Sequence, residues 1–210
     1  MLKNFIFDLD GTLIHSSPGI VYSFNNAYQQ VFSSDPDFEI EKHIGPPVSQ
    51  MLINNRPATT QEEMKDFVAA FQRIYDTEGY RNTEMFQQVE ETLHWLFENG
   101  KTLFVATNKR SGPTLSILEL LGIAKYFKDV YCIDSHHQVF SSKSKMIEHL
   151  LQTWNLDKSE TILIGDTAHD YKAAVDNTIG FIFAEYGYAT NEAYEQSIAS
   201  VDLIRNFITQ

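Results

Sequence analysis

Cysteine, positive charge and long apolar runs are all scarce in this chain of 210 residues. The single cysteine, Cys132, cannot form a disulfide within the chain, and its apolar neighbours indicate a buried strand. The chain suits a reducing compartment, and we expect a cytoplasmic protein. No apolar segment approaches the length of a membrane-spanning helix, and the apolar stretch at residues 2–9 lacks the cleavage site of a signal peptide. We therefore expect no membrane association.

Basic side chains are outnumbered, with 16 lysines and arginines against 28 aspartates and glutamates, which gives a net charge of -12. This charge repels polyanions and leaves no basic surface for DNA, RNA or anionic lipid. We expect no nucleic acid polymer among the partners. No feature of the sequence indicates an assembly, so a monomer or a weak dimer is the default expectation.

Apolar and aromatic residues, at 43% and 13% of the chain, are sufficient for a large core. Short apolar runs typical of buried strands lie at residues 4–9, 102–107, 130–134, 161–165 and 180–184. Helical patterns separate the last four runs, at residues 113–121, 143–154 and 170–177. This alternation predicts an α/β core in which helices flank a parallel five-stranded sheet.

The stretch between residues 16 and 79 breaks the alternation, because it has helical periods and no convincing strand. Ser17 and Pro18 can start one amphipathic helix, and Thr60 with Glu63 forms a capping box at the start of another. We interpret both apolar stripes as core, so that the two helices can pack together. The sequence predicts a helical insertion.

Two aspartates follow the first predicted strand. Asp8 and Asp10 lie on the same side of an extended strand, just before a turn at Gly11. Ligands bind at the carboxyl edge of parallel sheets. The pair by itself is equally compatible with solvated residues at the end of a strand.

A second buried strand ends in Gly165 and is followed by Asp166 and Asp170. A parallel sheet brings these two carboxylates and the first pair to one edge, where unpaired charges repel one another. Such a cluster needs a cation, and an all-oxygen set of ligands favours Mg²⁺ over Zn²⁺. Magnesium also binds phosphate.

Other polar residues reach the same edge. Thr107 and the Asn108 amide follow another strand and can donate hydrogen bonds to a phosphoryl oxygen. Lys143 begins an amphipathic helix, from which its ammonium can point back to the sheet and offset negative charge. Lys145 lies close enough to compete for that role, although Lys143 fits the helical register better. A solvated surface lysine is the alternative interpretation.

These residues resemble the four motifs of the haloacid dehalogenase-like hydrolase superfamily, and the chain looks like its phosphoglycolate phosphatase-like branch, which has a small helical cap. In chain order the motifs match Asp8-Leu-Asp10-Gly11-Thr12, Thr107, Lys143 and Gly165-Asp166-Thr-Ala-His-Asp170. The resemblance implies a Rossmann-like catalytic core of residues 1–15 and 82–210. It also implies that residues 16–81 form the cap, inserted after the first strand and hinged near residues 15–17 and 77–82.

The same resemblance implies a role for each residue. Asp8 attacks phosphorus and becomes an aspartyl phosphate, while Asp10 protonates the leaving oxygen and later deprotonates the hydrolytic water. Mg²⁺ would be bound by Asp8, the Asp10 carbonyl and Asp166, with Asp170 behind them or reached through water. The transferring phosphoryl group would be held by Thr107, the Asn108 amide and Lys143.

Two features of the expected cap and its hinge concern the substrate. Gly45-Pro46-Pro47 matches a loop that faces the substrate in this branch, although it is equally an ordinary turn between helices. His15 and Ser16 stand where relatives usually carry aspartate and then serine. We expect this departure to affect the hinge or substrate hydrogen bonding rather than phosphoryl transfer.

The sequence therefore predicts a Mg²⁺-dependent phosphatase for a small phosphorylated metabolite, such as a phosphoglycolate-like compound, a sugar phosphate or a nucleotide. A phosphoglucomutase-type isomerase shares all four motifs, and pyrophosphate is another candidate substrate. A non-enzymatic alternative is a phosphate-binding regulatory module of the receiver kind. The built-in acid/base Asp10 and the large insertion both argue against that alternative.

Overall fold

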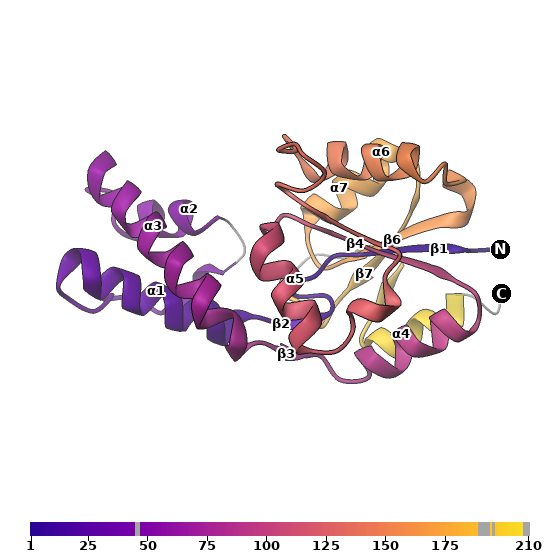
Figure 1. The fold of residues 1–210 in the computed structure, drawn as a ribbon, viewed down its shortest axis with the longest axis horizontal. Helices are drawn as coiled ribbons and strands as arrows, with labels where there is room; N and C mark the ends of the chain where they lie inside the picture. Colours follow the sequence, from indigo (N-terminus) through magenta and orange to yellow (C-terminus); the bar gives the residue numbers. More distant parts are fainter. Residues whose placement is uncertain (45–46, 189–193, 195, 208–210) are drawn as a thin grey trace. The chain divides into compact units, whose positions relative to one another are not determined.

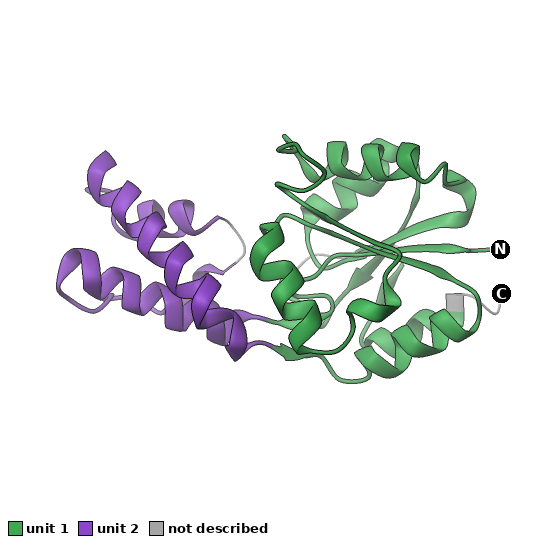
Figure 2. Ribbon diagram, in the orientation of Figure 1, with its two compact units in different colours: residues 1–15, 84–210 green, residues 16–83 purple. Residues whose placement is uncertain are grey.

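The computed structural model describes residues 1–44, 47–188, 194 and 196–207. The chain divides into two compact units, one formed by residues 1–15 and 84–210 and the other by residues 16–83 (Figure 2). Each unit has a separate cluster of buried apolar side chains. No helix in the described part of the chain is long and apolar enough to cross a membrane.

The first unit is built on a six-stranded sheet in which every neighbouring pair of strands is parallel (Figure 1). Its order is β5 (Asp129–Cys132), β4 (Thr102–Thr107), β1 (Asn4–Phe7), β6 (Thr161–Gly165), β7 (Gly180–Ala184) and β8 (Ser197–Ile198). The predicted α/β fold class is confirmed. The five expected strands are present, and β8 adds a sixth that is only two residues long, too short to stand out as an apolar run.

Helices flank this sheet. They are α4 (Val89–Glu98), α5 (Ser111–Leu120), α6 (Lys143–Thr153) and α7 (Ala168–Asn177). Helices α6 and α7 lie together on one face, and α4 lies on the other (Figure 1). The apolar stripe predicted for α6 is buried, since Met146, Ile147 and Leu150 pack into a cluster with Ile6 of the central strand and Leu163 of β6. This packing fixes the start of α6 close to the carboxyl ends of β1 and β6.

A short antiparallel pair carries the two connections to the inserted unit. Strand β2 (Ile14–His15) pairs with β3 (Glu84–Met85), with His15 opposite Glu84. Single-turn 3₁₀ helices occur elsewhere, at η1 (Ile40–His43), η2 (Gly79–Asn82), η3 (Ala124–Tyr126) and η4 (Lys158–Glu160), with a longer one at η5 (Val201–Phe207). The insertion therefore begins and ends at paired residues.

The inserted unit contains α1 (Ser17–Phe32), α2 (Val48–Asn55) and α3 (Gln61–Thr77). The predicted capping box is confirmed: the Thr60 hydroxyl accepts a hydrogen bond from the Glu63 amide at 3.2 Å, and the Glu63 carboxylate accepts one from the Thr60 amide at 2.7 Å. The predicted packing of α1 on α3 is confirmed as well, with the rings of Phe24 and Phe67 4.8 Å apart. Helix α2 was not predicted.

Candidate active site

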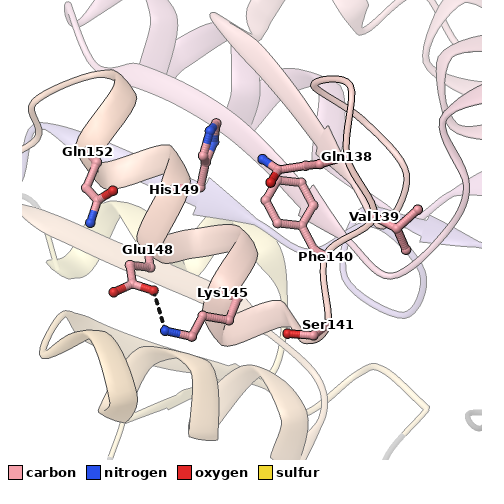
Figure 3. A pocket seen from close by; sticks show the side chains of 8 residues that line it. All are labelled: Gln138, Val139, Phe140, Ser141, Lys145, Glu148, His149 and Gln152. Atoms are coloured by element: carbon pink, nitrogen blue, oxygen red, sulfur yellow. Dashed lines mark hydrogen bonds and ion pairs between the residues drawn. The ribbon is translucent and has the colours of Figure 1, made fainter.

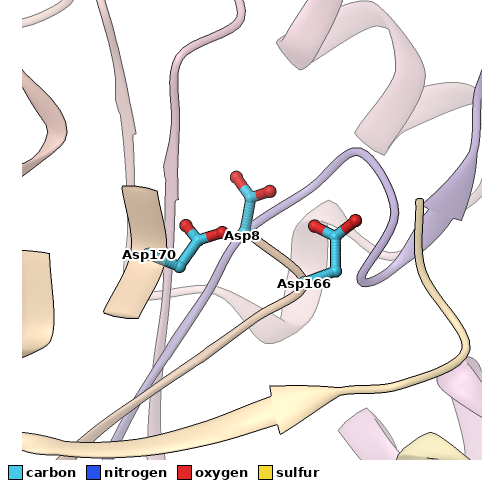
Figure 4. Close-up of side chains that lie close together, drawn as sticks. All are labelled: Asp8, Asp166 and Asp170. Carbon is cyan, nitrogen blue, oxygen red and sulfur yellow. The ribbon is translucent and has the colours of Figure 1, made fainter. Parts of the chain in front are cut away.

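Three buried aspartates meet at the carboxyl edge of the sheet. Asp8 follows β1, Asp166 follows β6, and Asp170 lies in the first turn of α7. Because β1 and β6 are parallel neighbours, with Phe7 beside Ile164, their carboxyl ends coincide. One carboxylate oxygen of each aspartate lies within 4.8 Å of the others, and Figure 4 shows the three groups turned to the same side. The structure thus brings together three of the four predicted aspartates.

Lys143, the first residue of α6, supplies the nearby cation. Its ammonium donates hydrogen bonds to Asp8 Oδ1 at 2.6 Å and to Asp170 Oδ1, and its side chain is 5% exposed. Lys145, the alternative candidate from the sequence, instead pairs with Glu148 at 2.7 Å, and its side chain is 64% exposed. Lys143 therefore contacts the acidic cluster, whereas Lys145 forms a surface pair.

Burial dominates the electrostatics of the cluster. Burial, together with the charges of Asp170 and Asp166, raises the pKa of Asp8 to about 8 against the opposing effect of Lys143. Burial also raises the pKa of Asp166 to about 6, although the Tyr188 amide favours its ionised form. Burial alone would lower the pKa of Lys143, but the carboxylates of Asp170 and Asp8 raise it. Without a further cation, the cluster therefore holds protons that free carboxylic acids release.

Glycines allow the chain to approach Asp166 closely. The Tyr188 amide donates a hydrogen bond to Asp166 Oδ2 at 2.7 Å. A Cβ atom at Gly187 or at Gly11 would collide with the Asp166 side chain, and Gly11 also adopts a φ of 82°. Tyr186 braces the same turn, because its hydroxyl donates to the Thr12 carbonyl at 2.8 Å. The segment after β7 thus orients Asp166, a contribution that sequence reasoning missed.

Asp170 is held from both sides. It forms a capping box with Thr167, whose amide and hydroxyl donate to Asp170 Oδ2 at 3.0 Å and 2.5 Å. Its other oxygen accepts from Lys143. Gly165 leaves room for this carboxylate, since a Cβ atom there would overlap it. The cap of α7 therefore fixes a carboxylate of the acidic cluster.

Asp10 lies apart from the three clustered carboxylates. Its two oxygens accept hydrogen bonds from Lys109 Nζ at 2.9 Å and 3.2 Å. The exposed fractions of the two side chains are 24% for Asp10 and 11% for Lys109. Sequence reasoning did not assign Lys109, although the signal was available: it lies two residues beyond Thr107, the last residue of the strand that pairs with β1.

The remaining predicted residues differ in placement. Thr107 is buried at the end of β4, where its hydroxyl accepts a hydrogen bond from the Lys109 amide at 3.2 Å. Asn108 is exposed. Pro47 is also exposed and immediately precedes α2. Gly45 and Pro46, the rest of the expected substrate loop, lie outside the described residues.

A pocket of about 290 Å³ lies elsewhere in this unit, beside α6 (Figure 3). Its lining consists of Gln138, Val139, Phe140, Ser141, Lys145, Glu148, His149 and Gln152. Among these residues, the sequence analysis considered Lys145, as the alternative to Lys143. The predicted aspartates and Lys143 lie at the sheet edge and not in this pocket.

Two curated proteins are similar to the chain along most of its length. Tyrosine-protein kinase PtkA of Mycobacterium tuberculosis is 28% identical over 93% of this chain, which spans only 66% of that relative's length. A 5'-nucleotidase of Pseudomonas aeruginosa is 28% identical over 90% of this chain and 85% of its own. These two names denote different reactions of phosphate groups.

A solved structure and a family model give the same assignment of fold and family. The structure of a predicted phosphoglycolate phosphatase from Haemophilus somnus superposes with a TM-score of 0.87 at 26% identity, covering 100% of this chain and 98% of that one. Residues 5–184 match the model of the haloacid dehalogenase-like hydrolases. The chain therefore belongs to the haloacid dehalogenase-like hydrolase family.

Proposed function

We propose that this protein is a Mg²⁺-dependent phosphatase that hydrolyses a small phosphomonoester through an aspartyl phosphate on Asp8. One observation carries the proposal: a buried lysine, Lys143, contacts Asp8 inside a cluster of three aspartates. Membership of the hydrolase family supports the reaction class. The substrate class is a phosphoglycolate-like compound, a sugar phosphate or a nucleotide.

The donor set fits a hard divalent cation. Three carboxylates are gathered with one lysine among them, so the cluster has excess negative charge and only oxygen ligands for a metal. Asp8, Asp166 and the Asp10 carbonyl would bind Mg²⁺, with Asp170 behind them or reached through water. When bound, the ion neutralises charge on the phosphoryl group and orients it.

Asp8 and Asp10 divide the covalent chemistry between them. An Asp8 carboxylate oxygen forms a bond to phosphorus as the bond from phosphorus to the leaving oxygen breaks, and that oxygen takes a proton from Asp10. Asp10 then accepts a proton from water, whose oxygen attacks phosphorus. The bond to Asp8 breaks, inorganic phosphate leaves, and both aspartates return to their starting states.

Lys143 serves the first of these steps by favouring the ionised form of Asp8, since a protonated carboxyl group is a poor nucleophile. Burial raises the pKa of Asp8 to about 8 even with the opposing effect of the adjacent ammonium. The lysine therefore does not offset burial alone, and a bound cation would have to complete the ionisation. Thr107, the Asn108 amide and Lys143 would hold the transferring phosphoryl oxygens, and donors preorganised in this way stabilise charge that develops during transfer.

The inserted helical unit is the natural element for choosing the substrate. The predicted catalytic residues all belong to the first unit, so the insertion is free to vary without loss of the chemistry. We assign it the role of a cap that admits a particular leaving group.

The test is phosphate release from a panel of 2-phosphoglycolate, sugar phosphates, nucleotides and pyrophosphate, with Mg²⁺ or with EDTA. Wild type should release phosphate only with Mg²⁺, and Asp8→Asn should reduce release to background. The matched control is Asp176→Asn, an exposed aspartate of α7 that pairs with Lys172 and should leave the rate unchanged. Release that persists in Asp8→Asn contradicts the proposed nucleophile, and conversion of a sugar phosphate to its isomer indicates a mutase.

A further inference from the structure

The sheet edge has a second lysine, Lys109, which contacts a different aspartate from Lys143. Lys143 contacts the proposed nucleophile Asp8, whereas Lys109 contacts the proposed acid/base Asp10. Its ammonium lies 2.9 Å and 3.2 Å from the two Asp10 oxygens. One ammonium therefore engages the whole carboxylate, which restricts its rotation.

This restraint matters because Asp10 lies only two residues from Asp8. The Asp10 side chain is a carboxylate as well, and so it could itself bind a hard cation. A carboxylate bound to a metal or turned away from the substrate cannot exchange a proton with the leaving oxygen. Asp10 must therefore be kept out of the cluster, and the structure has it outside, engaged with Lys109.

Both partners are held by their backbones. Strand β4 runs beside β1, with Val105 paired to Phe7, so the segments that follow the two strands are neighbours. On one side, the Lys109 amide donates to the Thr107 hydroxyl at 3.2 Å. On the other, the Gly11 amide donates to the Ile14 carbonyl at 2.9 Å, which closes the turn that begins at Asp10. The ion pair is thus preformed by the fold.

The pair is also better shielded from water than the surface pairs of the chain. Its side chains are 11% and 24% exposed, compared with 69% and 38% for Lys172 and Asp176 on α7. Exposed ion pairs contribute little to stability. When one partner of a shielded pair is removed, the other charge is left unpaired, and its side chain is expected to move. Lys172 therefore provides a matched control.

We infer that Lys109 is a positioning residue that holds the Asp10 carboxyl group in place for proton transfer: the ammonium donates to one oxygen of the group, and the other oxygen carries the proton that the leaving oxygen takes. The inference rests on the proposed phosphatase function, and it separates the duties of the two lysines. Lys143 acts on the nucleophile and the transferring group, and Lys109 acts through Asp10. Lys109 thereby joins the proton-transfer machinery without touching the reacting atoms.

Leaving-group chemistry gives a readout that a purely structural role would not produce. An alkyl phosphate needs a proton on its leaving oxygen, whereas p-nitrophenolate leaves without one. The ratio kcat/KM reports events up to formation of the aspartyl phosphate, the stage in which Asp10 acts as an acid. The decrease in kcat/KM caused by removing the Lys109 side chain should therefore depend on the leaving group.

The experiment compares Lys109→Met, Asp10→Asn and the double variant, using the alkyl phosphate that wild type hydrolyses fastest and p-nitrophenyl phosphate. Lys109→Met should lower kcat/KM for the alkyl phosphate about 100-fold, the effect of misplacing a catalytic group. The loss with p-nitrophenyl phosphate should be at least about tenfold smaller. The double variant should match Asp10→Asn within about twofold, because the two residues act as one unit.

Two further variants complete the design. Lys109→Arg should restore part of the loss, and Lys172→Met should behave as wild type. Equal losses with both substrates, or losses that multiply in the double variant, would overturn the inference and assign Lys109 to the phosphoryl group or to stability. Failure of wild type on every substrate counts against the proposed function instead. In that case a crystal structure of Lys109→Met decides: a displaced Asp10 carboxylate supports the inference, and an unmoved one overturns it.

Discussion

Lys143 shows how a single residue makes a buried acidic cluster tolerable. Three carboxylates removed from water repel one another, and an uncompensated buried charge is strongly destabilising. The Lys143 ammonium contacts two of them, Asp8 and Asp170. Its stem packs at the start of α6, so the charge is delivered by a well-anchored helix.

Replacing Lys143 with methionine should therefore damage catalysis far more than the same change at Lys145. We expect Lys143→Met to lower kcat by about 100- to 1,000-fold, the usual effect of removing one preorganised donor. Lys145→Met should leave kcat close to wild type, because Lys145 is exposed and pairs with Glu148. Steady-state kinetics on both variants measures the difference, and equal losses would place the functional lysine elsewhere.

The pKa shifts at the cluster predict how pH governs metal binding. Asp8 and Asp166 ordinarily titrate near 3.8, and burial raises their pKa values to about 8 and about 6 in the metal-free fold. Between pH 3.8 and these raised values, the folded protein therefore keeps protons that the unfolded chain has released. Its free energy of unfolding should fall as pH rises through that window.

Mg²⁺ binds ionised carboxylates, so its stabilising effect should grow over the same pH range. A free Mg²⁺ concentration of about 100 times Kd raises the free energy of unfolding by about 2.7 kcal/mol. We expect a gain of this size near pH 8 and a much smaller one near pH 5. Thermal unfolding with Mg²⁺ or EDTA measures it, and a gain that does not change with pH would contradict the account.

At the scale of the element, helices α3 and α7 both begin with a capping box, and the two capping boxes have different roles. The capping box of α3 joins Thr60 and Glu63 at the surface of the inserted unit. The capping box of α7 joins Thr167 and Asp170, and Asp170 is also part of the acidic cluster. The cap of α7 therefore serves the site as well as the helix.

Removing the N-cap side chain of each helix separates the structural role from the role in the acidic cluster. Thr167→Ala and Thr60→Ala should each cost about 1 kcal/mol of stability through loss of an N-cap. Only Thr167→Ala should also weaken Mg²⁺ binding, by about 10-fold or more, because it removes the hydroxyl hydrogen bond that helps to orient Asp170 behind the proposed metal ligands. Isothermal titration of both variants with Mg²⁺ compares them. Equal metal affinities would show that Thr167 caps the helix and nothing else.

Elements with long, regular patterns could be predicted from the sequence, and short or irregular ones could not. The apolar runs of β1 and β6 and the stripe of α6 predicted those elements, because their period is set by a buried face. Strand β8 has two residues, and α2 is a helix of eight residues that begins directly after Pro47, without a clear start signal in the sequence. Nothing in so short a segment separates it from a loop.

The site followed the same logic. Asp8, Asp166, Asp170 and Lys143 each adjoin a predictable strand or helix, so parallel-sheet topology was sufficient to bring them together. The Lys109 contact and the Tyr188 amide depend on the turns after β4 and β7, whose conformations arise from tertiary packing. The exposure of Asn108 could not be predicted either, because Asn108 lies in the same turn as Lys109.

At the scale of the whole molecule, the insertion is joined to the first unit at one pair of short strands and has a hydrophobic core of its own. It leaves and re-enters through β2 and β3, where His15 lies opposite Glu84. The buried clusters of the two units consist of different residues. An antiparallel pair of this kind can be closed by a two-residue hairpin turn.

Replacement of residues 16–83 by an Asn-Gly turn should therefore leave a folded first unit. We expect this variant to bind Mg²⁺ and to hydrolyse p-nitrophenyl phosphate, while its kcat/KM values across the substrate panel become more alike. Circular dichroism and the same kinetic panel measure the two outcomes. A folded variant with unchanged selectivity would contradict the proposed role of the insertion as the cap.

The most direct test of the central claim is to look for the phosphoryl group on Asp8. Asp10→Asn should slow hydrolysis of the intermediate, while p-nitrophenyl phosphate can form it without an acid. The variant is mixed with this substrate and Mg²⁺, quenched in acid, and analysed by peptide mass spectrometry. The account predicts phosphorylation of Asp8 that is absent with EDTA. Phosphorylation of another residue, or phosphate release with Asp8 unmodified throughout, would contradict it.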